Sequence, residues 1–351
     1  MDRADLRHRV RDALAAFLRR QRDLLADIDP ALLPVADAIE ALVLGGGKRL
    51  RPAFGYWAYR GAGGPDRDEV LATLSALELV QASALIHDDV MDGSDTRRGE
   101  PSIHRRFADA HTRQHWRGDP GSFGTASAIL LGDLCLVWSD ELLHGAGLDP
   151  ASLARVRPTF DLMRTEVTVG QYLDVQTQAT GDTSLLRASL IARYKSAKYT
   201  VERPMLLGAA LADAPPELHR AYSAYGLPLG EAFQLRDDIL GVFGDPKVTG
   251  KPAGDDLREG KRTYLVAAAL EKADAPEAAL LAGQLGTPDL DADAVARLRD
   301  VIVASGALTR TEQRIDELTA TAMDALATAG VEAEAFAVLS DLAQVATRRS
   351  G

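Results

Sequence analysis

Two acidic clusters lie at the ends of apolar stretches of this 351-residue chain, and the first consists of Asp88, Asp89 and Asp92. Asp88 and Asp92 are four residues apart, so a helix places them on one face, ~5–6 Å from each other. Carboxylates at that distance repel one another, and an apolar helix before them hinders their hydration. A hard divalent cation relieves this repulsion, and Mg²⁺ binds one or two carboxylates together with phosphate oxygens and water. Arg97 and Arg98 follow, and guanidinium groups bind phosphate bidentately.

The second cluster has the same design. Asp237 and Asp238 lie in an apolar stretch, with Gln234 about one helical turn before them. The loop that follows is rich in Gly, Pro and basic residues, namely Lys247, Lys251, Lys261 and Arg262. Such a loop has little to bury and suits a lid that orders over bound phosphate. Either cluster alone fits a solvated helix end beside a surface loop, but the repetition of the design favours two halves of one metal and anion site.

A third segment, residues 44–52, places Lys48, Arg49 and Arg51 directly after three glycines. Its spacing is not the G-x-x-x-x-G-K-[ST] of a nucleotide-binding P-loop. Glycines let a backbone approach a ligand closely, and with these cations they suit a diphosphate. A helix break with solvated basic side chains is the alternative.

The elements that carry these residues are predicted to be helices. Apolar residues make up 46% of the chain and aromatic residues 5%, and runs of β-branched residues are few, which favours helices over sheets. Apolar residues recur at helical intervals, beginning with Leu6, Val10, Leu14, Phe17 and Leu18. None of the Gly/Pro-rich stretches looks like an interdomain linker. We therefore predict an all-α protein with a single helical domain over residues 1–351.

Charge and cysteine content argue against several classes of protein. With 40 basic and 51 acidic residues the net charge is −11, which argues against a nucleic-acid-binding protein. The single cysteine, Cys135, cannot form an internal disulfide, and its apolar neighbours predict a buried, inert thiol in a reducing compartment. The N-terminal residues lack the apolar core of a signal peptide, and no uncharged run reaches the ~18 apolar residues of a membrane span.

The three segments together resemble the trans-isoprenyl diphosphate synthase (polyprenyl synthetase) family, in the branch of the geranylgeranyl and farnesyl diphosphate synthases. Motif order and spacing agree from about Leu42 to Thr263. The resemblance implies an isoprenoid-synthase-type helical bundle around a deep central cavity. It also implies a magnesium-dependent prenyltransferase that condenses isopentenyl diphosphate with an allylic diphosphate to give a linear isoprenoid diphosphate. Family members generally form homodimers. The acidic composition suits a soluble, cytoplasmic protein, and the hydrophobic product suggests no stable membrane insertion.

The resemblance also implies roles for the matching residues of this sequence. Three Mg²⁺ ions are expected with the allylic diphosphate, two on the first cluster and one on the second, held by Asp88, Asp89, Asp92, Asp237, Asp238 and Asp256. The expected contacts to isopentenyl diphosphate are Lys48, Arg51, Gln81 and Arg98. The expected contacts to the allylic diphosphate are Arg97, Lys195 and Lys251. Further polar residues expected at the substrates are Gln171, Asp174, Ser196, Gln234 and Lys261.

Two positions depart from the family pattern. Gly241 stands where the second motif often has a third aspartate, and we expect little loss because one carboxylate can anchor a Mg²⁺ whose other ligands are phosphate oxygens and water. Ser196 follows Lys195 where the family usually has threonine, and it keeps the hydroxyl.

In the implied mechanism the allylic C–O bond ionises and isopentenyl diphosphate attacks the cation. The released diphosphate takes the proton, so no side chain is assigned as general base.

The helix before Asp88 predicts the length of the product. Farnesyl-specific relatives have bulky aromatics where this chain has Ser83 and Ala84, so we expect the hydrocarbon channel to continue past fifteen carbons, with Leu77 as its floor. Geranylgeranyl diphosphate (C20) is therefore the predicted product. Small residues also pack well in any helix, and farnesyl or longer (C25 and above) products are the alternatives. A class I terpene cyclase and a non-catalytic partner subunit are the rival functions.

Overall fold

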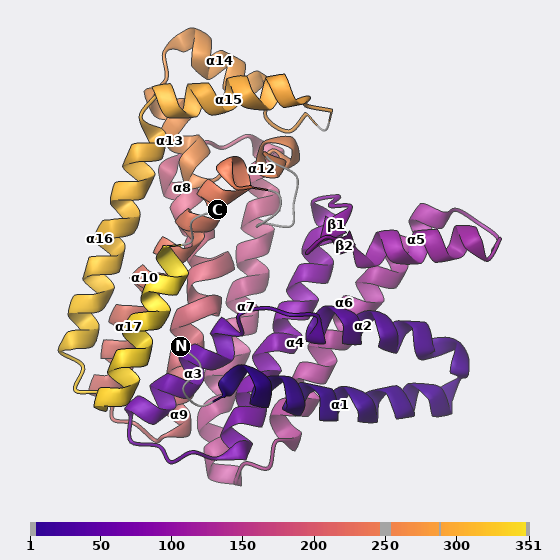
Figure 1. Ribbon diagram of the computed structural model, residues 1–351, viewed down its shortest axis with the longest axis vertical. Helices are drawn as coiled ribbons and strands as arrows, with labels where there is room; N and C mark the ends of the chain where they lie inside the picture. The colour runs from indigo at the N-terminus through magenta and orange to yellow at the C-terminus, as the bar shows by residue number, and fades with distance from the viewer. Residues whose placement is uncertain (1–4, 246–253, 288, 349–351) are drawn as a thin grey trace. The chain divides into compact units, whose positions relative to one another are not determined.

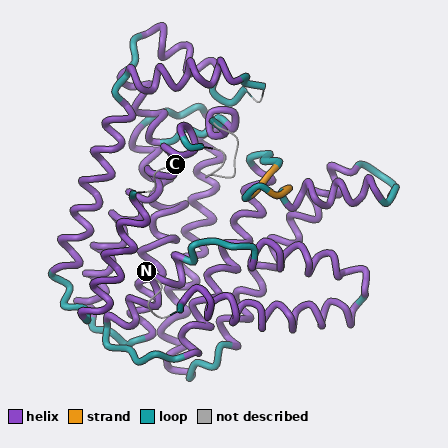
Figure 2. Tube along the Cα trace, viewed as in Figure 1, coloured by secondary structure: helices purple, strands orange, loops and turns teal. Residues whose placement is uncertain are grey.

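The structure is a computed structural model, and it describes residues 5–245, 254–287 and 289–348 (Figure 1). Helices make up nearly all of the described chain, and the strands within it form one short antiparallel pair (Figure 2). The prediction of an all-α protein is confirmed.

The chain divides into two compact units. The first is Met1–Arg157 with Leu207–Asp213, and the second is Pro158–Leu206 with Ala214–Gly351. Each unit is described by itself below. The single domain over residues 1–351 and its deep central cavity stay predictions.

The first unit is built around one long apolar helix, α4 (Asp68–Met91), which is buried on most of its faces. The other elements of this unit are α1 (Leu6–Ile28), the 3₁₀ turn η1 (Pro30–Leu32), α2 (Leu33–Leu44), α3 (Leu50–Gly61), the strands β1 (Thr96–Arg97) and β2 (Glu100–Pro101), α5 (Ile103–Arg113), α6 (Pro120–Gly145), the beginning of α7 (Pro150–Thr180) and the end of α9 (Arg203–Leu211). Helices α1, α2, α3, α5 and α6 all pack against α4. A helix that is apolar on all sides is typically buried in a core. The predicted metal ligands Asp88 and Asp92 lie at the C-terminal end of this buried helix.

The first residues of α4 and α6 are of types that stabilise the N-terminus of a helix. Asp68 and Glu69 lie in the first turn of α4, where their charges complement the helix dipole. At the start of α6 the side chain of Asp119 accepts a hydrogen bond of 2.7 Å from the backbone N–H of Ser122, and Pro120 occupies the first turn, as N-terminal capping favours. The predicted apolar positions of α1 are all buried, namely Leu6, Val10, Leu14, Phe17 and Leu18.

Two tight turns position basic residues beside α4. Gly46 and Gly47 have positive φ angles of 117° and 115°, and only glycine adopts these readily. They join α2 to α3. The second turn joins β1 to β2 through Arg98 and Gly99, whose φ angles are 56° and 80°. A two-residue hairpin loop with both φ angles positive is a type I′ turn, so Arg98 holds a backbone conformation that non-glycine residues rarely adopt.

The second unit surrounds α10 (Pro216–Phe243). Its other elements are the rest of α7, α8 (Leu185–Ile191), the π-helical segment η2 (Ala192–Glu202), the beginning of α9, α12 (Asp255–Glu259), α13 (Tyr264–Lys272), α14 (Ala275–Gln284), α15 (Ala292–Ala304), α16 (Ala307–Ala327) and α17 (Ala333–Thr347). Helix α10 packs against η2, α12, α13, α16 and α17. Its apolar residues, with those of α13 and α15, form a buried cluster.

Glycines let α10 lie very close to η2. A Cβ added at Gly226 would come within 2.8 Å of the Cα of Glu202, and one added at Gly230 would come within 2.5 Å of the carbonyl oxygen of Ala197. Gly226 and Gly230 are four residues apart on α10, so they present one flat strip. The π-helical segment packs on this strip, so the two glycines set the short distance between η2 and α10.

The prediction that Cys135 is buried is confirmed. Cys135 is fully buried in α6 and free. Burial raises the pKa of its thiol to about 12, so the reactive thiolate is essentially absent at neutral pH.

Two helices among the described residues are long and apolar enough to cross a membrane by length and composition. They are α4 and α6, and the most apolar window of α4 is 72% buried whereas that of α6 is 33% buried. The core position of α4 explains its composition. The apolar character of α6 has no such explanation within its own unit.

Candidate functional site

The first acidic cluster lies at the C-terminal end of α4. The backbone N–H of Asp92, which caps the helix, donates to the carbonyl oxygen of Asp88 over 2.8 Å. Asp88 and Asp92 are therefore one helical turn apart, with their side chains partly buried. Asp89 lies between them and is buried, with 3% of its surface exposed. The cluster thus offers two accessible carboxylates and one that faces the protein.

Arg97 neutralises part of this acidic cluster. Its Nε donates to Asp89 over 2.9 Å, its Nη2 also contacts Asp89, and Nη2 lies 3.5 Å from Asp88. The β1–β2 hairpin carries Arg97 back over the end of α4. The residue predicted to bind the allylic diphosphate therefore lies against the predicted metal ligands.

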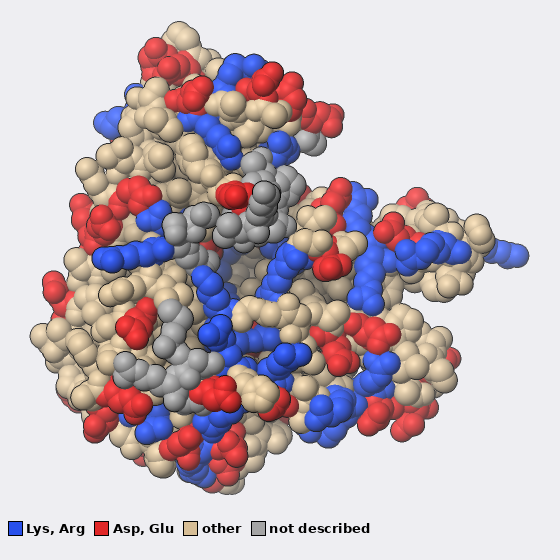
Figure 3. All heavy atoms as spheres, in the orientation of Figure 1, with Lys and Arg blue, Asp and Glu red and all other residues tan. Residues whose placement is uncertain are grey.

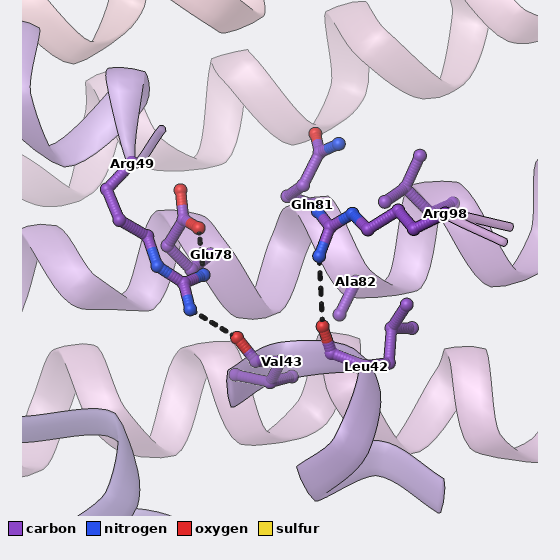
Figure 4. A pocket seen from close by; sticks show the side chains of 8 residues that line it. Leu42, Val43, Arg49, Glu78, Gln81, Ala82 and Arg98 are labelled. Atoms are coloured by element: carbon purple, nitrogen blue, oxygen red, sulfur yellow. Dashed lines mark hydrogen bonds and ion pairs between the residues drawn. The ribbon is translucent and has the colours of Figure 1, made fainter. Parts of the chain in front are cut away.

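Two of the predicted contacts to isopentenyl diphosphate, Gln81 and Arg98, line one small pocket beside α4. The pocket is lined by Leu42, Val43, Arg49, Glu78, Gln81, Ala82, Leu85 and Arg98. Figure 4 shows Gln81 and Arg98 side by side, with Arg98 directed towards Leu42 at the end of α2. Arg98 Nη1 donates to the carbonyl oxygens of Leu42 over 3.3 Å and Gly46 over 3.2 Å. Arg98 thus ties the hairpin to the end of α2 and to the glycine turn, while Lys48 is exposed and Arg51 half-buried.

Positive charge exceeds negative charge around Arg98. Burial lowers the pKa of its guanidinium, the carboxylate of Glu78 opposes this, and Arg49, Arg97 and Arg51 lower the pKa further. Among the strongest charge effects on Arg98, three come from arginines and one from a carboxylate, that of Glu78, although Arg97 is itself paired with Asp88 and Asp89. Such an excess favours the binding of an anion, and guanidinium groups match the oxygens of a diphosphate.

The predicted chain-length residues take different environments on α4. Leu77 is fully buried and Ser83 is 5% exposed, so both face the core of the first unit. Ala84 is only half-buried, and it precedes Asp88 by four residues, on the same helical face. Of the three predicted residues, Ala84 is therefore the one that shares the face of the metal cluster and remains accessible.

The second acidic cluster lies near the end of α10. Asp238 is 4% exposed, and its Oδ1 accepts a 2.7 Å hydrogen bond from Nε2 of Gln234, one turn earlier. Burial, and then the charges of Asp256 and Asp237, raise the pKa of Asp238 to about 8, although Gln234 and Lys261 act in the other direction. A nearby cation would stabilise the charged form of this cluster.

Asp256 from α12 completes the cluster, and Gly241 makes room for it. A Cβ added at Gly241 would lie 1.9 Å from Oδ2 of Asp256. The carboxylate of Asp256 thus rests on the bare backbone of α10 where the family's third aspartate would begin. Lys261 lies 3.9 Å from Asp256 and 2.8 Å from Glu259. Lys247 and Lys251, predicted for the basic loop, lie outside the described residues.

The π-helical segment presents Lys195 to α7. Lys195 Nζ lies 2.6 Å from Oδ2 of Asp174, which is 8% exposed. A Cβ added at Gly170 would come within 2.4 Å of the backbone nitrogen of Lys195, so the two helices touch here. Ser196, next in η2, is buried, and Gln171 is half-buried. The predicted lysine and aspartate are therefore brought together as an ion pair.

The carboxylates of both clusters fit the requirements of Mg²⁺. Within the described part of the chain, no three acidic, histidine or cysteine side chains converge as a metal site by themselves. Mg²⁺ takes one or two carboxylates and completes its octahedron with phosphate oxygens and water. The pKa of Asp238 is raised mainly by burial and further by the charges of Asp256 and Asp237, and a bound cation opposes both effects. Asp88, Asp92, Asp237 and Asp256 are half-buried and remain accessible to it.

Sequence reasoning missed the ion pair of Arg49 with Glu78. Arg49 Nη1 lies 2.5 Å from Oε2 of Glu78, and their side chains are only 5% and 7% exposed. One signal was present, because Glu78 is the only charged residue between Glu69 and Asp88, if histidine is taken as neutral. A lone carboxylate inside an apolar helix needs a buried partner.

Charges elsewhere on the surface are mixed. Acidic and basic side chains are interspersed with neutral ones on the face that Figure 3 shows. Some ion pairs on this surface are exposed, as for Arg220 with Glu217, and such pairs contribute little stability.

Comparisons with known sequences identify relatives with named activities. The polyprenyl synthetase family model matches residues 34–302. A geranylfarnesyl diphosphate synthase from Aeropyrum pernix is 34% identical over 277 residues, which are 78% of this chain and 80% of that protein. A geranylgeranyl diphosphate synthase from Methanosarcina mazei is 34% identical over 248 residues, covering 69% of this chain and 71% of the relative.

A solved structure gives the same result at the level of the fold. The crystal structure of a geranylgeranyl pyrophosphate synthase from Corynebacterium glutamicum, complexed with isoprenyl diphosphate and magnesium, superposes with a TM-score of 0.97. The two chains are 40% identical, and the match covers 100% of both.

Proposed function

Because this chain belongs to the polyprenyl synthetase family, we propose that it condenses isopentenyl diphosphate with an allylic diphosphate and releases a linear isoprenoid diphosphate. It is an enzyme, a prenyltransferase. The observation that carries the substrate class is the arginine charge gathered around Arg98, on which Arg49, Arg51 and Arg97 all act, beside the aspartates of α4 that Arg97 contacts. A diphosphate bridged to carboxylates by divalent cations satisfies both sets of charges.

We propose that the two acidic clusters act on the same leaving group. Mg²⁺, when bound, supplies positive charge that stabilises the departing diphosphate. Asp88, Asp92 and Asp237 would hold these ions, with Asp89, Asp238 and Asp256 in support. Lys195 and Arg97 now pair with Asp174 and with Asp89, so these partners hold both cations in place until a substrate phosphate competes for them. Charges placed in advance stabilise charge that develops only during reaction.

Condensation needs no basic side chain of this protein. Lys48, Arg51, Gln81 and Arg98 would orient isopentenyl diphosphate so that its double bond meets the allylic carbon. Holding two reactants in a near-attack geometry lowers the entropic part of the barrier. The proton lost at the end passes to the released diphosphate. Three Mg²⁺ ions, and Lys251 as a further contact to the allylic diphosphate, belong to this proposal.

Incubation with isopentenyl diphosphate, Mg²⁺ and either dimethylallyl, geranyl or farnesyl diphosphate tests the function. We expect linear products, with the C20 diphosphate as the main one, identified by chromatography after removal of the diphosphate. Cyclic hydrocarbons from an allylic diphosphate alone would indicate a terpene cyclase instead. No consumption of isopentenyl diphosphate with any primer would contradict the proposal and favour a non-catalytic subunit.

The accessible face of α4 supports a product longer than fifteen carbons. We predict that Ala84→Phe shortens the product towards C15, because an aromatic ring at this half-buried position fills space on the face that leads from Asp88. The product lengths of the variant and the wild-type protein are compared by chromatography. Ser83→Phe is the less clean test, because Ser83 is buried in the core. An unchanged product profile of Ala84→Phe would contradict this placement of the channel.

The exposed apolar face of α6 supports a homodimer. Leu130 and Val137 lie two turns apart on this helix and are 65% and 62% exposed, and Ile129 is 45% exposed. Exposed apolar patches of this kind mark interfaces, and a second copy of the chain is the occupant that we propose. We predict that Leu130→Asp shifts the molar mass by light scattering from twice that of the chain to that of one chain. A wild-type protein that is monomeric, or that sediments with vesicles, would contradict the dimer.

Acidic composition and water-soluble diphosphate substrates support a cytoplasmic enzyme whose membrane contact is at most transient. The hydrophobic tail of the product would then be handed over rather than made within a bilayer.

A further inference from the structure

One buried ion pair lies beneath the residues proposed to bind isopentenyl diphosphate, and the family resemblance gives it no role. Arg49 leaves the glycine turn with a positive φ of 51°, a strained conformation for an arginine. Its side chain turns inward, pairs with Glu78 at 2.5 Å and donates to the carbonyl oxygen of Val43. Figure 4 shows both interactions.

This pair links three segments that carry the predicted diphosphate contacts. Glu78 lies one helical turn before Gln81 on α4. Arg49 lies between Lys48 and Arg51 in the sequence, so whatever fixes Arg49 also fixes the backbone that carries both. Arg98 donates hydrogen bonds to Leu42 near the C-terminal end of α2 and to Gly46 just after it.

We propose that the Glu78–Arg49 pair is a positioning element for isopentenyl diphosphate. The pair holds the backbone turn that carries Lys48 and Arg51 at a fixed distance from Gln81. Glu78 and Arg49 act through these neighbours and need not touch the substrate. The inference rests on the proposed function for the identity of the ligand. It depends on the geometry of the first unit alone.

Charge and position predict opposite effects for one substitution. Glu78 is the carboxylate that opposes the arginine charges around Arg98. If Glu78 only balanced charge, Glu78→Gln would make the pocket more positive and would tighten the binding of a diphosphate. If Glu78 positions Arg49, the same substitution loosens the turn and weakens binding. The sign of the change therefore separates the two roles.

Isothermal titration with isopentenyl diphosphate alone measures this sign without any turnover. We expect the Kd of Glu78→Gln to rise about 10-fold or more, the size of loss seen when a supporting residue around a binding site is removed. In steady-state assays the KM for isopentenyl diphosphate should rise by a similar factor, while kcat and the KM for the allylic substrate stay within about 2-fold, because only one binding step is affected.

A double variant separates positioning from stability. Replacing a buried ion pair with apolar residues of similar size is often neutral or stabilising, so Arg49→Met with Glu78→Leu should unfold at or above the wild-type temperature. It also leaves the net charge unchanged. Its Kd for isopentenyl diphosphate should nevertheless rise as in the single variant, because the anchor of the turn is gone.

Ser75→Ala is the matched control for damage to α4. Ser75 is fully buried on this helix, and its hydroxyl donates to the carbonyl oxygen of Leu71 over 2.8 Å. This variant should lose stability and keep the wild-type Kd. A Kd for Glu78→Gln or the double variant that equals or falls below the wild-type value would overturn the proposal. Wild-type protein that binds isopentenyl diphosphate without turning it over would contradict the proposed function but not this inference.

Discussion

Turnover should fall by about 10³-fold or more when Asp88 or Asp237 is replaced by alanine, since fixed charges that stabilise a leaving group contribute at least this much. Both side chains are half-buried and accessible at the ends of apolar helices, and neither supports the core. The helical fold, measured by circular dichroism and thermal unfolding, should therefore be retained. Assays at saturating Mg²⁺ show whether excess metal restores activity, which we do not expect because the ligand itself is missing.

Two exposed aspartates serve as controls for this experiment. Asp109 on α5 and Asp300 on α15 are exposed, and their replacement by alanine changes the net charge of the protein equally. Both variants should keep wild-type turnover. Near-normal turnover of Asp88→Ala or Asp237→Ala would remove that residue from the proposed metal site.

Restoring the family's third aspartate should damage this enzyme. The carboxylate of Asp256 rests against Gly241, where a Cβ would lie 1.9 Å from its Oδ2. Gly241→Asp and Gly241→Ala both add this Cβ, so both must displace Asp256 from the cluster that contains Asp237 and Asp238. We expect activity and Mg²⁺ affinity to fall about 10–100-fold in each, as when a residue that supports metal ligands is lost.

The comparison of the two Gly241 variants separates displacement from carboxylate number. If the number of carboxylates mattered most, Gly241→Asp would equal or exceed the wild-type activity and only Gly241→Ala would be impaired. Alanine favours a helix over glycine by about 1 kcal/mol, which opposes the cost of the clash with Asp256, and thermal unfolding of Gly241→Ala shows whether stability is lost. Gly283 on α14 is the control, because a Cβ there meets nothing within 4 Å. Mg²⁺ affinity, measured by titration with a diphosphate analogue present, gives a readout besides turnover.

Short-range patterns in the sequence predicted much of this fold. Helical periodicity and the lack of strand signals gave the all-α class, and the apolar positions of α1 are buried as expected. The spacing of Asp88 and Asp92 predicted one helical turn, because that distance is set by the helix alone. The buried state of Cys135 followed from its apolar neighbours.

Features that depend on contacts between distant segments were not predictable. Arg49 looked like a solvated cation of a glycine turn, yet it is buried against Glu78. No local feature of residues 192–202 distinguishes a π-helix from an α-helix. In the structure this π-helical segment packs against Gly226 and Gly230 of α10, which are distant in the sequence. Asp256 on α12 lies against Gly241 on α10, so the sequence showed a missing aspartate but not the carboxylate that fills its place.

The path of the backbone has a consequence for how this protein can be divided. The chain passes from one compact unit to the other after Arg157, after Leu206 and after Asp213, and the first two of these passages lie inside α7 and α9. The returning stretch is integral to the first unit, because Gly208 packs against the backbone of Gly55 so closely that a Cβ would lie 2.1 Å from its carbonyl oxygen. A gene fragment that stops at Arg157 would therefore encode an incomplete unit. Recombination between relatives therefore exchanges the first unit intact only if residues 207–213 are exchanged together with residues 1–157.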